Sequence, residues 1–119
     1  MVSVTADQIR KRLGLTSQDI SDEDVLAFRD EVVAFLSEEI GRTINVESYT
    51  QAEANAIRNL AAIYCYCHVT GGSALGLNFH VGDLGVSESA VKQIEFLKQQ
   101  IERFIAREKR FGISLQEGP

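Results

Sequence analysis

The sequence predicts a mainly α-helical fold, a small bundle of about four helices with a short β-hairpin or extended loop before the last helix. Three observations predict it. The only proline is the final residue, Pro119, so no internal position forbids a helix. Capping residues and glycines divide the chain into four segments. Within those segments, apolar residues recur every three or four positions, which is the period of an amphipathic helix.

The first two helices are predicted from their capping residues. Thr5 and the glutamine three residues later have capping-box spacing, which predicts a short helix over 6–13 that stops at Gly14. Ser21 precedes three acidic residues, which favour the positive end of a helix dipole, so a second helix begins there and ends at Gly41. Its predicted inward residues are Val25, Phe28, Val32, Phe35, Leu36 and Ile40.

The third helix begins at another capping box, Thr50 with Glu53, and ends at Gly71 and Gly72. The stretch 60–69 is apolar nearly all round, which predicts the central and most buried helix. Its inward residues are Ala54, Ile57, Leu60, Ala61, Tyr64, Cys65 and Val69.

The last helix is predicted to begin near Ser87 or Ser89, run toward Phe111 and end at Gly112. Its inward stripe is Val91, Ile94, Leu97, Ile101, Phe104 and Ile105. Nine side chains are expected to meet in the core of the bundle: Phe28, Val32, Leu36, Ile57, Leu60, Tyr64, Leu97, Ile101 and Phe104.

The segment 71–86 differs from the rest, because it contains five of the nine glycines and alternates apolar with small or polar residues. This pattern predicts two short strands around a Gly82-Asp83 turn. A lone hairpin is marginal in water, so it must pack on its own helices or on a neighbouring subunit. The residues expected to make subunit contacts are Leu77, Phe79, Val81, Asp83, Leu84 and Val86.

Composition limits the class of protein. A chain of 119 residues, 45% apolar and 24% charged, is typical of one globular domain over 1–119, with an ordered core at about 5–111. The net charge of -5 argues against a broad basic surface for nucleic acid. The longest apolar stretch is too short for a bilayer and no basic-then-apolar leader opens the chain, so we expect neither a membrane span nor a secretory signal.

We expect no enzyme, no metal and no cofactor. Cys65 and Cys67 lie about 200° apart on a helix, so with His68 they do not form a metal site. The pair suits buried, reduced thiols and a cytoplasmic setting. The glycines at 71–76 lack the lysine of a phosphate-binding loop, and no serine lies in a nucleophile-elbow pattern.

Charge is distributed unevenly along the chain. Between 17 and 47 there are nine acids and two arginines, whereas between 88 and 110 there are four acids and six bases. Head-to-tail docking of identical subunits would bring the two segments together, and such contacts close into rings when the rotation permits. The expected complementary charges are Asp22, Glu23 and Asp24 on one side and Arg103, Arg107 and Arg110 on the other.

The order of these parts, and the segment from Phe79 to Ser87 with its Gly-Asp turn followed by Val-Ser, resemble the head–tail connector (adaptor, or head-completion) proteins of tailed viruses and proviruses. The resemblance covers about residues 5–111. It implies a structural subunit that forms a ring of about twelve copies beneath the portal protein. The polar tail 114–119 is shorter than the C-terminal segments with which relatives often reach the portal.

The resemblance also implies partners and a location. Such a subunit extends the DNA channel, touches DNA only as it passes, and docks the next neck or tail protein. It resides in the virion neck, and in the host cytoplasm before assembly. Two other classes remain open: a helical protein-interaction module and a small DNA-binding regulator. The regulator needs an exposed basic recognition helix after a tight turn, which the apolar third helix does not supply.

Overall fold

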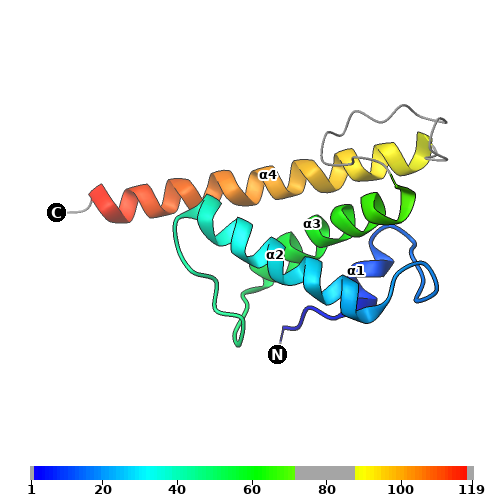
Figure 1. Ribbon diagram of the computed structural model, residues 1–119. Helices are drawn as coiled ribbons and strands as arrows, with labels where there is room; N and C mark the ends of the chain where they lie inside the picture. Colours follow the sequence, from blue (N-terminus) through cyan, green and yellow to red (C-terminus); the bar gives the residue numbers. More distant parts are fainter. Residues whose placement is uncertain (1, 72–87, 118–119) are drawn as a thin grey trace.

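The computed structural model describes residues 2–71 and 88–117, which form four helices. They are α1 (Ala6–Lys11), α2 (Asp22–Ile40), α3 (Gln51–Thr70) and α4 (Glu88–Glu117), arranged as a helical bundle (Figure 1). The predicted mainly α-helical class is therefore confirmed. The predicted hairpin and its six contact residues, Leu77 to Val86, lie outside the described residues.

The ends of α2 and α3 follow from the residues that cap them. Ser21 accepts a hydrogen bond from the backbone N–H of Asp24, and Thr50 and Glu53 form a reciprocal capping box at the start of α3. Gly41 and Gly71 end the two helices with φ of 77° and 69°, left-handed values that glycine adopts without a steric penalty. The predicted boundaries of both helices are confirmed.

Two predicted helix ends are wrong. α1 ends at Lys11, not at residue 13, because the chain turns early and the N–H of Leu15 donates to the Arg10 carbonyl at 3.0 Å. α4 does not stop at Gly112 but continues to Glu117. A glycine inside a helix costs about 1 kcal/mol relative to alanine, which weakens the helix without breaking it as proline would.

α3 is the central helix, since it packs against each of the other three. Figure 1 shows α2 and α1 on one side of α3 and α4 on the other, with the last turns of α4 extending past α2. With 30 residues at 1.5 Å each, α4 is about 45 Å long. None of the described helices has both the length and the apolarity needed to cross a bilayer.

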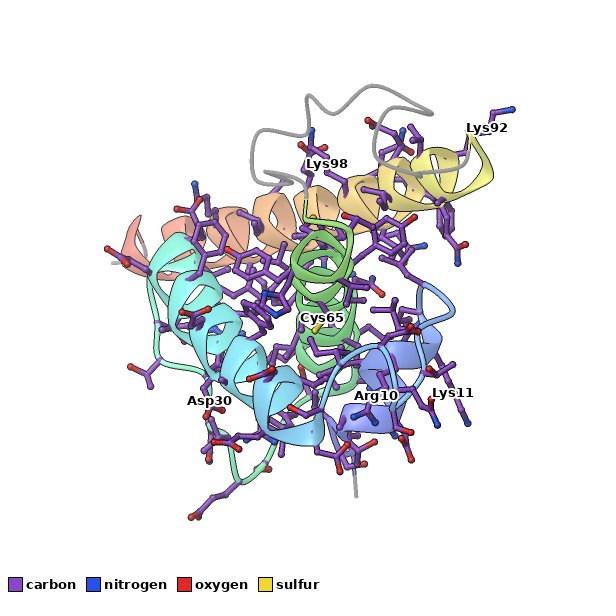
Figure 2. All side chains as sticks on the ribbon, turned by 45° about the vertical axis from the view of Figure 1, so that its right-hand side comes forward. Arg10, Lys11, Asp30, Cys65, Lys92 and Lys98 are labelled. Carbon is purple, nitrogen blue, oxygen red and sulfur yellow. The ribbon has the colours of Figure 1, made fainter. Side chains whose placement is uncertain are left out.

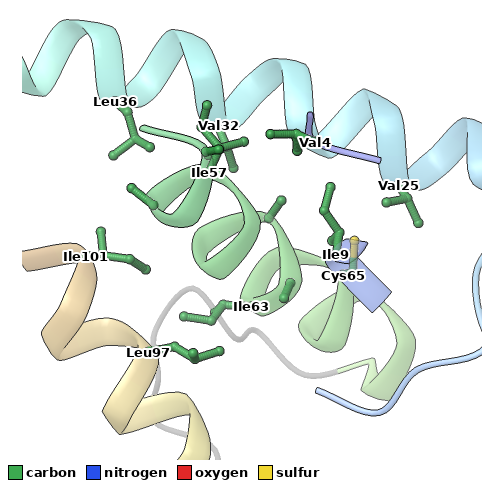
Figure 3. Close-up of a cluster of buried hydrophobic side chains, with 14 of the residues drawn as sticks. Val4, Ile9, Val25, Val32, Leu36, Ile57, Ile63, Cys65, Leu97 and Ile101 are labelled. Carbon is green, nitrogen blue, oxygen red and sulfur yellow. The ribbon is translucent and has the colours of Figure 1, made fainter. Parts of the chain in front are cut away.

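The core lies between all four helices (Figure 3). Six of the nine predicted core residues are buried: Val32, Leu36, Ile57, Leu97, Ile101 and Phe104. Phe28, Leu60 and Tyr64 are only partly buried and pack at its rim, where the Phe28 and Tyr64 rings meet edge to face. Phe35, predicted to face inward, is 42% exposed, because Leu36 occupies the buried stripe and Phe35 lies about 100° around the helix from it.

Candidate interaction surfaces

The acidic start of α2 contains Asp22, Glu23 and Asp24, all exposed residues in the first turn. Asp22 is also part of the fold, because one of its carboxylate oxygens accepts a hydrogen bond from Nη2 of Arg10. No such partner is found for the carboxylates of Glu23 and Asp24 within the described part of the chain. These two acids are therefore the ones that remain for an external contact.

Arg10 joins α1 to the start of α2, although its residue is only 3% exposed. Its Nε and Nη2 donate to the carbonyl of Ile20 at 3.2 and 2.9 Å, and its Nη1 donates to Asp7 at 3.0 Å. The hydrogen bond to Asp22 is the main reason that the pKa of Arg10 is raised. Arg10 was not identified from the sequence as a buried residue. Its position four residues after Ala6 places it on the inward face of α1 and could have indicated this.

The basic part of α4 presents Arg103 and Arg107 one turn apart, both exposed. Neither arginine takes part in an ion pair among the residues that the structure describes. The third predicted base, Arg110, lies on α4 with its side chain outside the described residues. Two of the three predicted bases thus form an unneutralised pair on one helix face.

A groove of about 470 Å³ runs between α3 and α4 beside this arginine pair. It is lined by Gln51, Ala52, Asn55, Ala56, Asn59, Gln100, Arg103, Phe104 and Arg107. Asn59 is 2% exposed, and its Nδ2 donates to Gln100 Oε1 at 3.5 Å. The Asn59 Oδ1 is buried and has no hydrogen-bond partner in the described ranges. The groove therefore combines positive charge with amide groups that can bind polar side chains.

Arg42 holds the end of α2 against both α3 and α4. Its Nη1 donates to Glu53 Oε2 at 2.6 Å, and its Nη2 forms an ion pair with Glu108. These hydrogen bonds, with that to Glu108 the stronger influence, raise the pKa of Arg42. Because Glu108 lies next to Arg107 in sequence, the basic part of α4 lies near the end of α2. The acidic first turn lies at the other end of that helix.

The cysteine and histidine cluster is divided between the interior and the surface. Cys65 and Cys67 are buried in α3, and Figure 2 labels Cys65 among the helices. Burial raises the pKa of Cys65 to about 12 and that of Cys67 to about 11. His68 is exposed and its ring lies 5.5 Å from that of Phe28. Across residues 2–71 and 88–117, no group of three His, Cys, Asp or Glu side chains could hold a metal ion.

Among the described residues, two phenylalanines are exposed on the outer faces of the bundle. Phe96 of α4 is 57% exposed and Phe35 of α2 is 42% exposed. Single exposed apolar residues are ordinary on a protein surface, so they carry no assignment alone. Comparison of the chain with protein-family models, with curated proteins and with solved structures gives no match.

Proposed function

We propose that this chain is a structural subunit of the head–tail connector of a tailed virus or provirus. It assembles as a ring beneath the portal protein, extends the DNA channel and docks the next neck or tail protein. The observation that carries the proposal is that two patches of opposite charge lie at the two ends of α2. Glu23 and Asp24 lie at its first turn, and Arg103 and Arg107 lie near its last.

The separation of these charges favours contact between copies over contact within one chain. α2 has 19 residues, so its ends are about 28 Å apart. Exposed charges at that distance are screened at physiological ionic strength, where the Debye length is about 8 Å. Two copies placed head to tail bring the patches together, and repeating the same rotation gives a closed ring. The charges would set the register of the contact and make assembly sensitive to salt.

Apolar burial would supply the rest of the association energy. The proposed contributors are Phe79, Val81 and Leu84 of the hairpin predicted from the sequence. Burying apolar surface contributes about 25 cal/mol per Å² before the costs of association. In this proposal the portal acts as the template for ring closure, so a monomer in isolation is compatible with it.

The test uses two charge-reversed variants. One variant carries Glu23→Lys with Asp24→Lys, and the other carries Arg103→Glu with Arg107→Glu. Each variant alone brings like charges together in a head-to-tail contact, so neither should add a ring to the portal protein of the same genome. An equimolar mixture of the two restores opposite charges at every contact. We expect electron microscopy to show the ring again, with an even number of copies.

Asp22 stays unchanged in this design, because its loss would remove a partner of the buried Arg10 guanidinium. Melting curves of both variants control for folding. A wild-type chain that adds no density to the portal would contradict the connector proposal. Rings formed by either variant alone would refute the charge-directed contact. A separate variant, Phe79→Asp with Leu84→Asp, tests the hairpin and should abolish the ring while leaving the melting temperature unchanged.

A further inference from the structure

A second basic cluster, separate from Arg103 and Arg107, lies where α1 ends against α3. It consists of Lys11, Arg12 and Arg58, which together with Gln8 line a surface depression of about 320 Å³. Figure 2 labels Lys11 at this end of α1, well away from Lys92 and Lys98 on α4. The cluster brings three cationic side chains together on a chain whose net charge is -5.

The two arginines of the cluster have only neutral hydrogen-bond acceptors. Arg12 Nη2 and Arg58 Nη1 both donate to Asn55 Oδ1, at 3.3 and 3.1 Å. Arg58 also donates to the side-chain oxygen of Gln8 and to the backbone carbonyl of Ser3. Among the described residues, neither arginine has a carboxylate partner.

This arrangement contrasts with the other arginines that pack against the fold. Arg10, Arg29 and Arg42 each form an ion pair with at least one carboxylate. At Arg58, by contrast, burial and the nearby charge of Arg12 lower the pKa. Two like charges held around a single amide oxygen repel each other, and an anion between them would relieve that repulsion.

The cluster also has hydrogen-bond donors to spare. A guanidinium has five N–H groups and an ammonium three. Arg12 uses one of them in the described structure and Lys11 uses none. Planar guanidinium groups bind carboxylates through two parallel hydrogen bonds. We propose that Lys11, Arg12 and Arg58 bind the carboxylates of an acidic segment in a protein partner.

An acidic protein segment suits the site better than a nucleic acid does. A DNA duplex carries phosphate charge along its whole length, and the nine acids between residues 17 and 47 would repel it. A short acidic peptide responds mainly to charges within about 8 to 10 Å, the Debye length at moderate salt. It would therefore experience the local positive charge of the cluster more than the negative charge of the whole chain.

The probe for the test is a fluorescently labelled oligoglutamate peptide, with an oligoglutamine peptide of the same length as the neutral control. Anisotropy at about 100 mM salt, where the Debye length is about 10 Å, should detect binding of oligoglutamate alone. Arg12→Gln with Arg58→Gln should weaken that binding about tenfold or more, since two charge-assisted contacts are lost. Lys92→Gln with Lys98→Gln removes the same net charge on α4 and should change it by less than about twofold.

A second variant keeps Arg58, because its guanidinium contacts Ser3 and Asn55 and its substitution can destabilise the fold. Lys11→Gln with Arg12→Gln leaves those contacts in place and should also weaken binding about tenfold. Equal affinities for oligoglutamate and oligoglutamine, or equal losses in the α4 control, would overturn the site. Tighter binding of a short DNA duplex through the same residues would overturn the ligand class. The proposed ring uses other residues, so failure of the ring assay leaves this test intact.

Discussion

Removal of the buried cation Arg10 should destabilise the protein less than removal of its two acidic partners. The side chain of Arg10 is 4% exposed, whereas those of Asp7 and Asp22 are 83% and 72% exposed. In Arg10→Leu, both carboxylates return to water, and the main loss is the hydrogen bonding of the buried Ile20 carbonyl. An unsatisfied buried carbonyl costs about 1–3 kcal/mol, so we expect a loss of about 2 kcal/mol.

The opposite change leaves a charge inside the protein. Asp7→Asn with Asp22→Asn keeps the Arg10 guanidinium buried, with only neutral acceptors around it. Leaving a buried charge without its partner costs about 3–5 kcal/mol. Arg10→Leu should therefore be more stable than the double acidic variant by at least about 1 kcal/mol. If each ion pair simply contributed its own energy, Arg10→Leu would instead be the less stable of the two, because it also loses the hydrogen bonds to Ile20.

Urea unfolding followed by circular dichroism at pH 7 measures both variants. The matched control is Glu23→Gln with Asp24→Asn, which removes two acids from the same helix turn without touching Arg10. That control should lose about 1 kcal/mol or less, through the helix dipole alone. If Arg10→Leu proves as unstable as the double acidic variant, the asymmetry derived from exposure is wrong.

Two further predictions concern α3. Ile57→Ala should lower the free energy of unfolding by about 2–5 kcal/mol, because Ile57 is fully buried. Leu60→Ala should lower it by about 1–2 kcal/mol, because Leu60 lies at the rim of the core. Equal losses in urea unfolding would contradict the described packing. The thiol pKa values of about 12 for Cys65 and 11 for Cys67 predict a pH effect. In the unfolded chain the thiols lose their protons near pH 9, whereas in the folded chain they keep them to higher pH. The free energy of unfolding is therefore unaffected by the thiols below about pH 9. Above it, the free energy of unfolding falls by up to about 1.4 kcal/mol per thiol per pH unit, until the pH reaches the native pKa values. Cys65→Ala with Cys67→Ala should flatten the decline between pH 8 and 10 relative to the parent, and an unchanged slope would show that the thiols are not buried.

The sequence predicted the helices well because the signals that define them are local. A capping box such as Thr50 with Glu53 spans four residues, and a C-terminal glycine such as Gly41 is recognised from its own position in the sequence. The centrality of α3 also followed from its own composition. Gly112 misled the prediction because glycine weakens a helix and does not end it without further contacts.

The buried polar groups could not be predicted in the same way. Arg10 is buried because Ile20 and Asp22, from a later part of the chain, supply its acceptors. Glu53 was recognised as a capping residue, but its ion pair with Arg42 depends on how the end of α2 meets α3. Contacts of this kind arise from tertiary packing, which periodicity and capping rules do not describe.

The candidate charges were identified from sequence, but their availability was not. Asp22 was grouped with Glu23 and Asp24 because the three are adjacent, yet only Asp22 contacts Arg10. Lys11, Arg12 and Arg58 were not singled out, because 46 positions separate Arg12 from Arg58 in the sequence and their shared acceptor, Asn55, is recognised only in the folded chain. A pattern in the sequence shows which charges exist, whereas the packing decides which of them are already neutralised.

The partners of the arginines therefore divide them into two groups with different expected behaviour. Arg10 and Arg42 each bind two carboxylates and join helices, so their substitution should affect folding first. Arg12 and Arg107 have no carboxylate partner among the described residues, and Arg12 donates only to the neutral Asn55 side chain there. Without a carboxylate partner, these cations gain no ion-pair stabilisation from the described residues. An anionic surface on another molecule would supply the missing carboxylates, and this is why both proposals place a partner there.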